Sequence, residues 1–248
     1  EDKILECTEC NQKVVKDNDT FDTWFSSGQW PFASLGYPDS LDFKNFYPTD
    51  VMETAGEIIF FWVSRMIMLG LYITGEIPFK TVYLHGLVLD AKGKKMSKSK
   101  GNIIDPLTLT EKYGTDAFRI GMVVGNTPGT SLALSENKIR GYKNFANKIW
   151  NATRFVLENT EDYNENVALD DEDQESDEEL SNFVKAITKE MDEYKFYLAG
   201  EKIYHYFWHT FADVLIERSK KKINDGKNAD SARKLLYTQL ITLLKLLH

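Results

Sequence analysis

A short basic stretch that follows an alternating apolar run limits what this 248-residue chain can fold into. The apolar run, residues 81–88, has the residue types and alternation of a β-strand. The basic stretch, residues 93–102, holds four lysines and two serines between two glycines. Glycine lets a backbone bend, and serine hydroxyls, backbone N–H groups and ammonium groups all bind phosphate oxygens. A basic loop that follows a strand suits the binding of a polyphosphate, and a solvated basic loop with no ligand has the same composition.

Composition and charge narrow the class of protein. The formal net charge is −8 and 42% of residues are hydrophobic, which is ordinary for a globular protein with a sizeable core. The longest apolar run, residues 58–73, is interrupted by Ser64, Arg65 and Gly70, so we expect no membrane span. No signal peptide is visible and two cysteines make no disulfide framework, so we expect a cytoplasmic protein or a piece of one.

The loop and three further stretches resemble the class I aminoacyl-tRNA synthetases, and among them the valyl-tRNA synthetases. Lys95-Met96-Ser97-Lys98-Ser99 is similar to the signature loop of that class. The other stretches are residues 21–27, 57–66 and 141–156, which read FDTWFSS, EIIFFWVSRM and GYKNFANKIWNATRFV. The resemblance runs in order along the chain. It implies an internal or C-terminal fragment, without the first half of the catalytic domain, its His-Ile-Gly-His motif or the editing domain.

The resemblance implies an α/β part followed by a helical part. Residues 21–130 would form the second half of a Rossmann-type catalytic domain that carries the signature loop. Residues 131–158 would be a connecting helix, and residues 159–179 an acidic linker whose four consecutive acids from residue 170 cannot pack. Residues 180–248 read as a truncated α-helical bundle of the anticodon-binding type. Its helices are expected at residues 180–198, 201–222 and 230–247, with Gly200 in the first turn between them.

A nucleotide site around the loop is the next implication of the resemblance. Lys98 and Lys95 would be catalytic and would meet the charge that grows on the departing pyrophosphate. Gly86 would let the adenine approach the backbone, and Glu57 would lie near the ribose of ATP. Mg²⁺ is expected on the phosphates, mainly through waters and phosphate oxygens. The full set of implied ATP-binding residues is Glu57, His85, Gly86, Leu87, Lys95, Met96, Ser97, Lys98 and Ser99.

The resemblance also implies an amino-acid pocket and a tRNA surface. Trp24, Ile58 and Trp62 would line the pocket. Ile58 and Trp62 stand four residues apart, on one face of a helix expected over residues 57–73; without the resemblance, core packing is the commoner role at this spacing. The connecting helix has a basic side that can be a solvated face or a phosphate contact. The tRNA contacts implied there are Lys143, Asn147, Lys148 and Arg154.

Two pairs of residues have the spacing of metal ligands. Cys7 and Cys10 can hold one edge of a tetrahedral Zn²⁺ site, which needs four ligands. In the resemblance such a pair closes a small zinc-binding insert whose other half lies upstream, so residues 1–20 would be a remnant of it. The two cysteines are therefore half a site or plain thiols. His205 and His209 could chelate a metal on a helix, although packing on a helix face is the commoner role.

The function implied is a part of a valine–tRNA ligase. Such an enzyme activates valine with ATP to valyl-adenylate and transfers the valine to tRNA(Val). We expect these 248 residues alone to be inactive, and the full-length protein to be a monomer. An isoleucyl or leucyl enzyme is the nearer alternative. The sequences of residues 58–62 and 144–155 favour a valyl enzyme instead. A non-catalytic nucleotide- or tRNA-binding module derived from a synthetase is the second.

Overall fold

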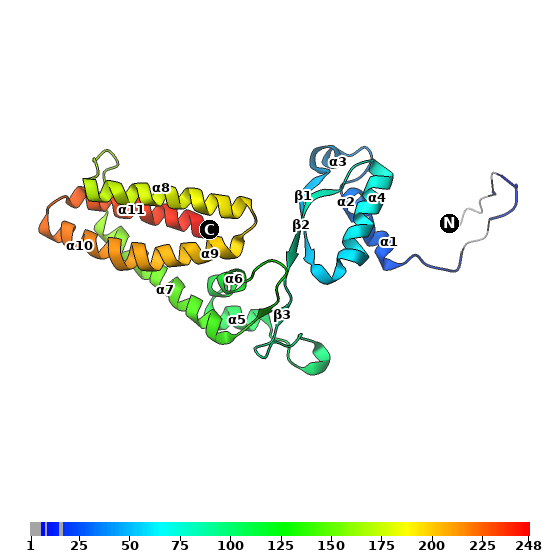
Figure 1. Cartoon of the computed structure of the whole chain (residues 1–248), viewed down its shortest axis with the longest axis horizontal. Coiled ribbons are helices and arrows are strands. Elements are labelled where there is room, and N and C mark those ends of the chain that lie inside the picture. Colours follow the sequence, from blue (N-terminus) through cyan, green and yellow to red (C-terminus); the bar gives the residue numbers. More distant parts are fainter. Residues whose placement is uncertain (1–5, 8, 15–16) are drawn as a thin grey trace. The chain divides into compact units, whose positions relative to one another are not determined.

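The computed structural model describes residues 6–7, 9–14 and 17–248, which form two compact units (Figure 1). Unit 1 is Glu1–Leu84 and unit 2 is His85–His248. Each unit has a hydrophobic core of its own. The predicted order, an α/β part and then a helical bundle, is confirmed.

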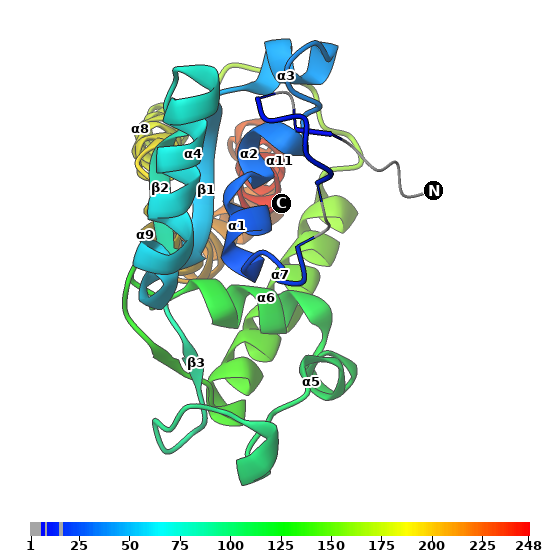
Figure 2. The same ribbon diagram turned by 90° about the vertical axis from the view of Figure 1, so that its right-hand side faces the viewer.

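Unit 1 gathers short helices beside a two-stranded sheet (Figure 2). The strands are β1 (Thr49–Ala55) and β2 (Phe79–His85). Val63, Met66 and Phe79 form its buried core. Its helices are α1 (Thr23–Gly28), α2 (Trp30–Ala33), α3 (Leu41–Phe46) and α4 (Ser64–Thr74).

The helix predicted over residues 57–73 forms, but it is irregular. A 3₁₀ turn (Gly56–Ile58) leads into a π-helix (Ile59–Val63), and regular α4 begins only at Ser64. Ile58 and Trp62 do not lie on the regular α-helix from which a shared face was predicted, and 3₁₀ and π turns change the angle between successive residues. That they share a face stays a prediction.

The run Gly56–Thr74 bears on our expectation of no membrane span, which stays a prediction. It is the single helical stretch in the described part of the chain that is long and apolar enough to cross a bilayer by length and composition. The interruptions at Ser64, Arg65 and Gly70 do not remove that property. Val63 and Met66 on this stretch are buried in the core of unit 1, whereas most of its other residues are half-buried or exposed.

Unit 2 begins with the loop region and two short helices. The predicted strand over residues 81–88 is split, because β2 ends at His85 and β3 (Val88–Leu89) follows. β3 pairs in parallel with β4 (Leu132–Ala133), with Val88 opposite Leu132. A second core of Leu109, Ala117, Leu134 and Ile139 lies under helices α5 (Pro106–Tyr113) and α6 (Thr115–Val123).

The predicted connecting helix is α7 (Glu136–Asn159), whose N-cap Ser135 accepts the N–H of Lys138. It leads into a bundle whose core includes Phe207, Phe211 and Leu240. Figure 1 shows α8, α11 and the α9–α10 rod side by side. The elements of the bundle are α8 (Asp171–Asp192), α9 (Phe196–His205), a π-helix (Tyr206–Leu215), α10 (Ile216–Asp225) and α11 (Ala229–Leu247).

The turn predicted at Gly200 was wrong. The chain turns earlier, where Tyr194 has a φ of 58°, and Gly200 lies inside α9. A Cβ at Gly200 would lie 2.9 Å from Cγ2 of Val124. The glycine is therefore needed for the close approach of α9 to α6, and not for a turn.

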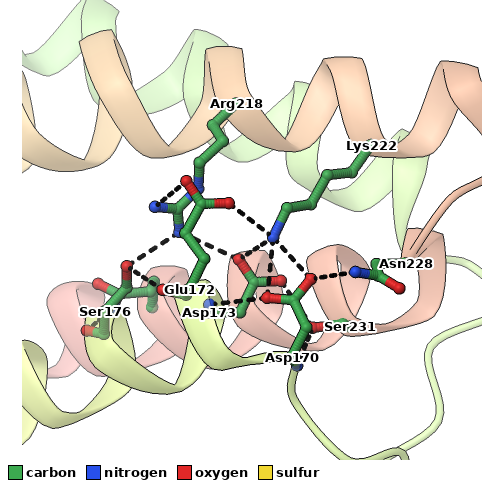
Figure 3. A network of polar contacts seen from close by, with 9 residues as sticks. Asp170, Glu172, Asp173, Ser176, Arg218, Lys222, Asn228 and Ser231 are labelled. Carbon is green, nitrogen blue, oxygen red and sulfur yellow. Dashed lines mark hydrogen bonds and ion pairs between the residues drawn. The ribbon is translucent and has the colours of Figure 1, made fainter.

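The acidic linker predicted at residues 159–179 was also wrong, because α8 already begins at Asp171 and Asp173 is fully buried. Figure 3 shows the network that makes this possible. Lys222 Nζ lies 2.8 Å from Asp170 Oδ2 and 2.8 Å from Asp173 Oδ1. Arg218 donates to Asp173 Oδ1 at 3.0 Å, and the Ser231 hydroxyl donates to Asp173 Oδ2 at 2.6 Å.

The acids pack because two effects neutralise them. Asp170 caps α8 by accepting the N–H of Asp173, and the N-terminal end of a helix attracts negative charge. Arg218 and Lys222, from α10, supply the opposite charge. Asp170, Glu172 and Asp173 also form the one cluster of three possible metal ligands in the described residues. Since both cations already bind this cluster, its geometry is explained without a metal.

Candidate nucleotide and amino-acid sites

The signature loop is closed on itself by Asp90 and Asn102, to which the sequence analysis gave no role. The Asp90 carboxylate accepts the N–H groups of Lys92 and Lys94, each at 2.9 Å. Asn102 donates to Asp90 Oδ2 at 2.8 Å and accepts the N–H of Ser97 at 3.0 Å. The hydrogen bond from Asn102, then that from Lys94, lowers the pKa of Asp90 below its ordinary value, so this brace is anionic.

The braced loop presents charge to solvent. Lys95 and Lys98 are exposed, and Lys98 begins a 3₁₀ turn (Lys98–Lys100). The hydroxyls of Ser97 and Ser99 lie 3.2 Å apart. Met96 has a structural role, since its sulfur accepts the N–H of Ile104 at 3.4 Å. Two exposed ammonium groups and two hydroxyls on one loop are suited to bind phosphate oxygens.

Gly86 has a packing reason of its own. A Cβ there would lie 1.4 Å from the carbonyl oxygen of Thr130, so only glycine fits. Leu132 donates its N–H to the Leu87 carbonyl at 2.8 Å, and His85 Nδ1 lies 3.0 Å from the Gly86 carbonyl oxygen. The adenine contact implied for residues 85–87 stays a prediction. Glu57, implied for the ribose, is exposed in the 3₁₀ turn of unit 1.

Trp24 and Trp62, predicted to line the amino-acid pocket, belong to two elements that contact each other in unit 1. The Trp62 indole N–H donates to the carbonyl oxygen of Ser27, at the end of α1, at 3.0 Å. The Trp24 ring stacks on Phe61 with a centroid distance of 6.1 Å. Ile58 ends the 3₁₀ turn, and like the two tryptophans it is half-buried.

Two further contacts, neither of which was predicted from the sequence, hold α1 against α4. Asp22 caps α1 and pairs with Arg65 of α4 at 3.1 Å. A Cβ at Gly28 would lie 2.9 Å from Leu69 Cδ1, so glycine lets the helices touch. An aspartate just before a helix can be recognised in a sequence as an N-cap. Its pairing with Arg65, 43 residues later, cannot be recognised there.

The basic residues predicted to contact tRNA already have partners in the chain. Lys148 pairs with Asp213 at 2.8 Å and lies over the ring of Trp208. Lys143 donates to the Lys112 carbonyl at 3.2 Å, and Arg154 pairs with Glu158 at 3.4 Å. Asn147 is exposed. A phosphate would have to compete for these cations, and their role stays a prediction.

Cys7 and Cys10 fit half of a zinc site. Cys7 donates its N–H to Gln12 and accepts that of Asn11, both at 2.9 Å, which closes a tight turn. Hydrogen bonds from the backbone of Glu9, then of Cys10, lower the pKa of the Cys7 thiol, which favours the metal-binding thiolate. Among the described residues no third ligand joins them. The rest of residues 1–20 includes 1–5, 8 and 15–16, which lie outside the described residues.

The histidine pair does not pack into the core. His205 and His209 are exposed, and their rings stack with centroids 5.7 Å apart. Nδ1 of His209 lies 3.5 Å from Asp213, the carboxylate that also binds Lys148. Two exposed imidazoles make at most two metal ligands, and the described residues add no third.

Comparison with known families gives two matches along the chain. Residues 1–135 match the tRNA synthetases class I (I, L, M and V). Residues 173–248 match the anticodon-binding domain of tRNA ligase.

Curated relatives extend this similarity over nearly the whole chain. A valine–tRNA ligase of Syntrophotalea carbinolica is 45% identical over 98% of this chain and 28% of the relative. Those of Clostridium tetani and Bacillus cereus (strain ATCC 14579) are 42% and 46% identical, over 100% and 94% of this chain and 29% and 28% of the relatives. The chain thus spans less than a third of the length of these relatives.

Solved structures share the fold at low identity. A LeuRS–tRNA–LeuAMS ternary complex of Agrobacterium radiobacter K84 has a TM-score of 0.73 at 19% identity, over 98% of this chain and 33% of that one. A methionyl-tRNA synthetase of Mycobacterium tuberculosis bound by methionyl-adenylate has a TM-score of 0.68 at 22% identity, over 90% and 46%. These likenesses show a fold in which an α/β part is followed by a helical bundle.

Proposed function

This chain belongs to the class I tRNA synthetases, and from that membership we propose that it is part of a valine–tRNA ligase. The observation that carries the proposal is the 42–46% identity to valine–tRNA ligases over 94–100% of the chain. In the proposed reaction the valine carboxylate attacks the α-phosphate of ATP, pyrophosphate leaves, and valyl-adenylate forms. Valine then passes to the 3′ end of tRNA(Val).

The loop residues would act by charge and position. Lys98 and Lys95 are exposed point charges on a loop that Asp90 and Asn102 brace. An ammonium group placed where negative charge develops stabilises the transition state more than the ground state. The family uses ATP with Mg²⁺, which would be held mainly by phosphate oxygens and waters and would neutralise phosphate charge.

Valine would be selected by size. The proposed walls, Trp24, Ile58 and Trp62, are apolar, and the hydrogen bond from Trp62 to Ser27 fixes one of them. An extra methylene in a closely packed apolar site typically costs about 1–3 kcal/mol, which disfavours isoleucine. The tRNA would bind the helical bundle, which matches an anticodon-binding domain. A cytoplasmic location and a monomeric state stay predictions from the sequence.

The test is aminoacylation by the full-length protein that contains this chain. Transcripts of tRNA(Val), tRNA(Ile) and tRNA(Leu) are each incubated with ATP, Mg²⁺ and radiolabelled valine, isoleucine or leucine. We expect charging with valine and much slower charging with the other two. Preferred charging of a different tRNA with isoleucine or leucine would contradict the valyl assignment, and absence of any charging would support a non-catalytic module.

A further inference from the structure

A cavity of about 270 Å³ lies between α7 and α9 in unit 2, and none of the sites described above uses it. α7 connects the region that matches the synthetase family to the region that matches the anticodon-binding domain. The residues that line it include Lys138, Gly141, Tyr142, Glu201, Tyr204 and His205.

Packing does not explain Gly141. Glycine weakens a helix relative to alanine, because it loses more backbone freedom on folding. At Gly121 and Gly200, also in helices, a Cβ would lie 2.5 Å from Ile139 and 2.9 Å from Val124, so close packing accounts for them. At Gly141 a Cβ would meet, apart from the nearby backbone of its own helix and its two chain neighbours, no atom of the described chain within 4 Å. Because residue 141 has no side chain, the cavity that it lines stays open.

The walls of the cavity are aromatic. The rings of Tyr142 and Tyr204 lie edge to face with centroids 5.9 Å apart. His205 stands at 87° to Tyr204, with centroids 5.3 Å apart. Proteins that bind single-stranded RNA stack unpaired bases on tyrosine and histidine rings of this kind.

Hydrogen-bond donors and a hydrogen-bond acceptor lie among these rings. Lys138 is half-buried and donates to the carbonyl oxygen of Val124 at 2.7 Å. The exposed Glu201 carboxylate can only accept hydrogen bonds when it is ionised. Burial, together with the nearby Tyr204 and Glu201, raises the pKa of Tyr142, so its hydroxyl stays a donor. A nucleobase edge carries both carbonyl acceptors and N–H donors, which these groups complement.

We propose that this cavity binds one unstacked nucleobase of the RNA that the full-length protein charges. The base would stack on the tyrosine rings, with Glu201 accepting its N–H groups and Lys138 donating to a ring carbonyl. The proposal rests on the proposed function, since that function supplies the RNA.

The test fills the cavity without disturbing the helix. In the full-length protein, Gly141→Phe places a ring where, apart from the same helix backbone and chain neighbours, no atom of the described chain stands within 4 Å of the new Cβ. We expect a tRNA(Val) transcript to bind about 5- to 100-fold more weakly, the loss typical for one stacked base. The melting temperature should not fall. Asn151→Phe, which adds the same side chain at an exposed position of α7, is the matched control and should bind like the wild type.

A second pair of variants removes a wall instead of filling the space. Tyr204→Ala should weaken binding over the same range, whereas Tyr204→Phe keeps the stacking surface and most of the affinity. Equal binding by Gly141→Phe and Asn151→Phe would overturn the proposal. So would a lower melting temperature of Gly141→Phe with unchanged tRNA binding, which would assign the cavity to another segment of the protein. A wild-type protein that binds no tRNA would overturn the proposed function as well.

Discussion

Lys98 differs from its neighbouring lysines in how its position is fixed. It begins the 3₁₀ turn whose preceding residue, Ser97, is bonded to Asn102. Lys92 lies earlier in the loop, where its N–H binds Asp90. Both side chains are exposed, so the two lysines differ in their position on the loop and not in their burial.

The first prediction uses this difference. In the full-length enzyme Lys98→Ala should slow adenylate formation about 100- to 1,000-fold, because one preorganised charge contact is typically worth about 3–4 kcal/mol in the transition state. Affinity for ATP should change little. Single-turnover kinetics measure the two effects separately. Lys92→Ala is the control, and a Lys98→Ala rate equal to that of the control would identify Lys98 as an ordinary solvated charge.

Trp62 carries the second prediction. Trp62→Ala removes a wall of the proposed pocket and should raise the KM for valine, while the loss of a large aromatic ring can cost about 3–5 kcal/mol of stability. Trp62→Phe keeps an apolar ring but loses the donor to Ser27, so it should have a smaller effect on both. Steady-state kinetics on variants shown to be folded by circular dichroism give the answer. Trp30→Ala, at an exposed position, is the control. An unchanged KM for valine in Trp62→Ala would show that Trp62 packs in the core and does not line the pocket.

At the scale of elements, the start of α8 depends on charges that come from another helix. Asp173 has no exposed surface, and its carboxylate binds Arg218, Lys222 and Ser231. Removing one partner of a buried ion pair leaves the remaining charge without compensation, which destabilises more than the pair itself stabilises.

Asp173→Ala should therefore lower the free energy of unfolding by about 3–5 kcal/mol. Asp171→Ala, in the same first turn but exposed, should cost under about 1 kcal/mol. Denaturant unfolding followed by circular dichroism compares the two. Similar losses in both variants would show that the network in Figure 3 contributes no more than a surface charge.

The same network predicts a loss of stability in acid. Burial raises the pKa of Asp170, but hydrogen bonds from Lys222, Asp173 and Asn228 outweigh it and lower the pKa overall. A carboxyl group with a lowered folded pKa adds stability above its unfolded pKa of about 3.9, and this is lost as the pH falls through the folded value. Unfolding curves below about pH 4 should therefore depend less steeply on pH in Asp170→Asn than in wild type. Identical pH dependence would contradict this.

The sequence predicted local features and missed distant ones. An N-cap such as Ser135 is a local signal, and the connecting helix expected within residues 131–158 forms as α7. The acidic run was misread because its partners, Arg218 and Lys222, lie more than 40 residues away. Gly200 was misread as a turn because its reason is the neighbouring helix α6. In the candidate site, the lysines could be predicted from the sequence motif. The hydrogen bond between Asn102 and Asp90 could not, because it depends on how the loop folds.

At the scale of the whole molecule, the chain spans 28–29% of its curated relatives. The residues of the proposed pocket belong to unit 1 and those of the signature loop to unit 2. The catalytic claim therefore concerns the full-length protein, and the 248 residues alone are expected to show no exchange of pyrophosphate into ATP.

The most direct measurement of the central claim is amino-acid-dependent exchange of labelled pyrophosphate into ATP by the full-length protein. It reports adenylate formation without tRNA, so it tests the pocket and the loop together. We predict that valine supports the fastest exchange, that isoleucine and leucine support far less, and that Lys98→Ala abolishes most of it. Faster exchange with isoleucine or leucine than with valine, or none with any amino acid, would contradict the assignment to valine activation.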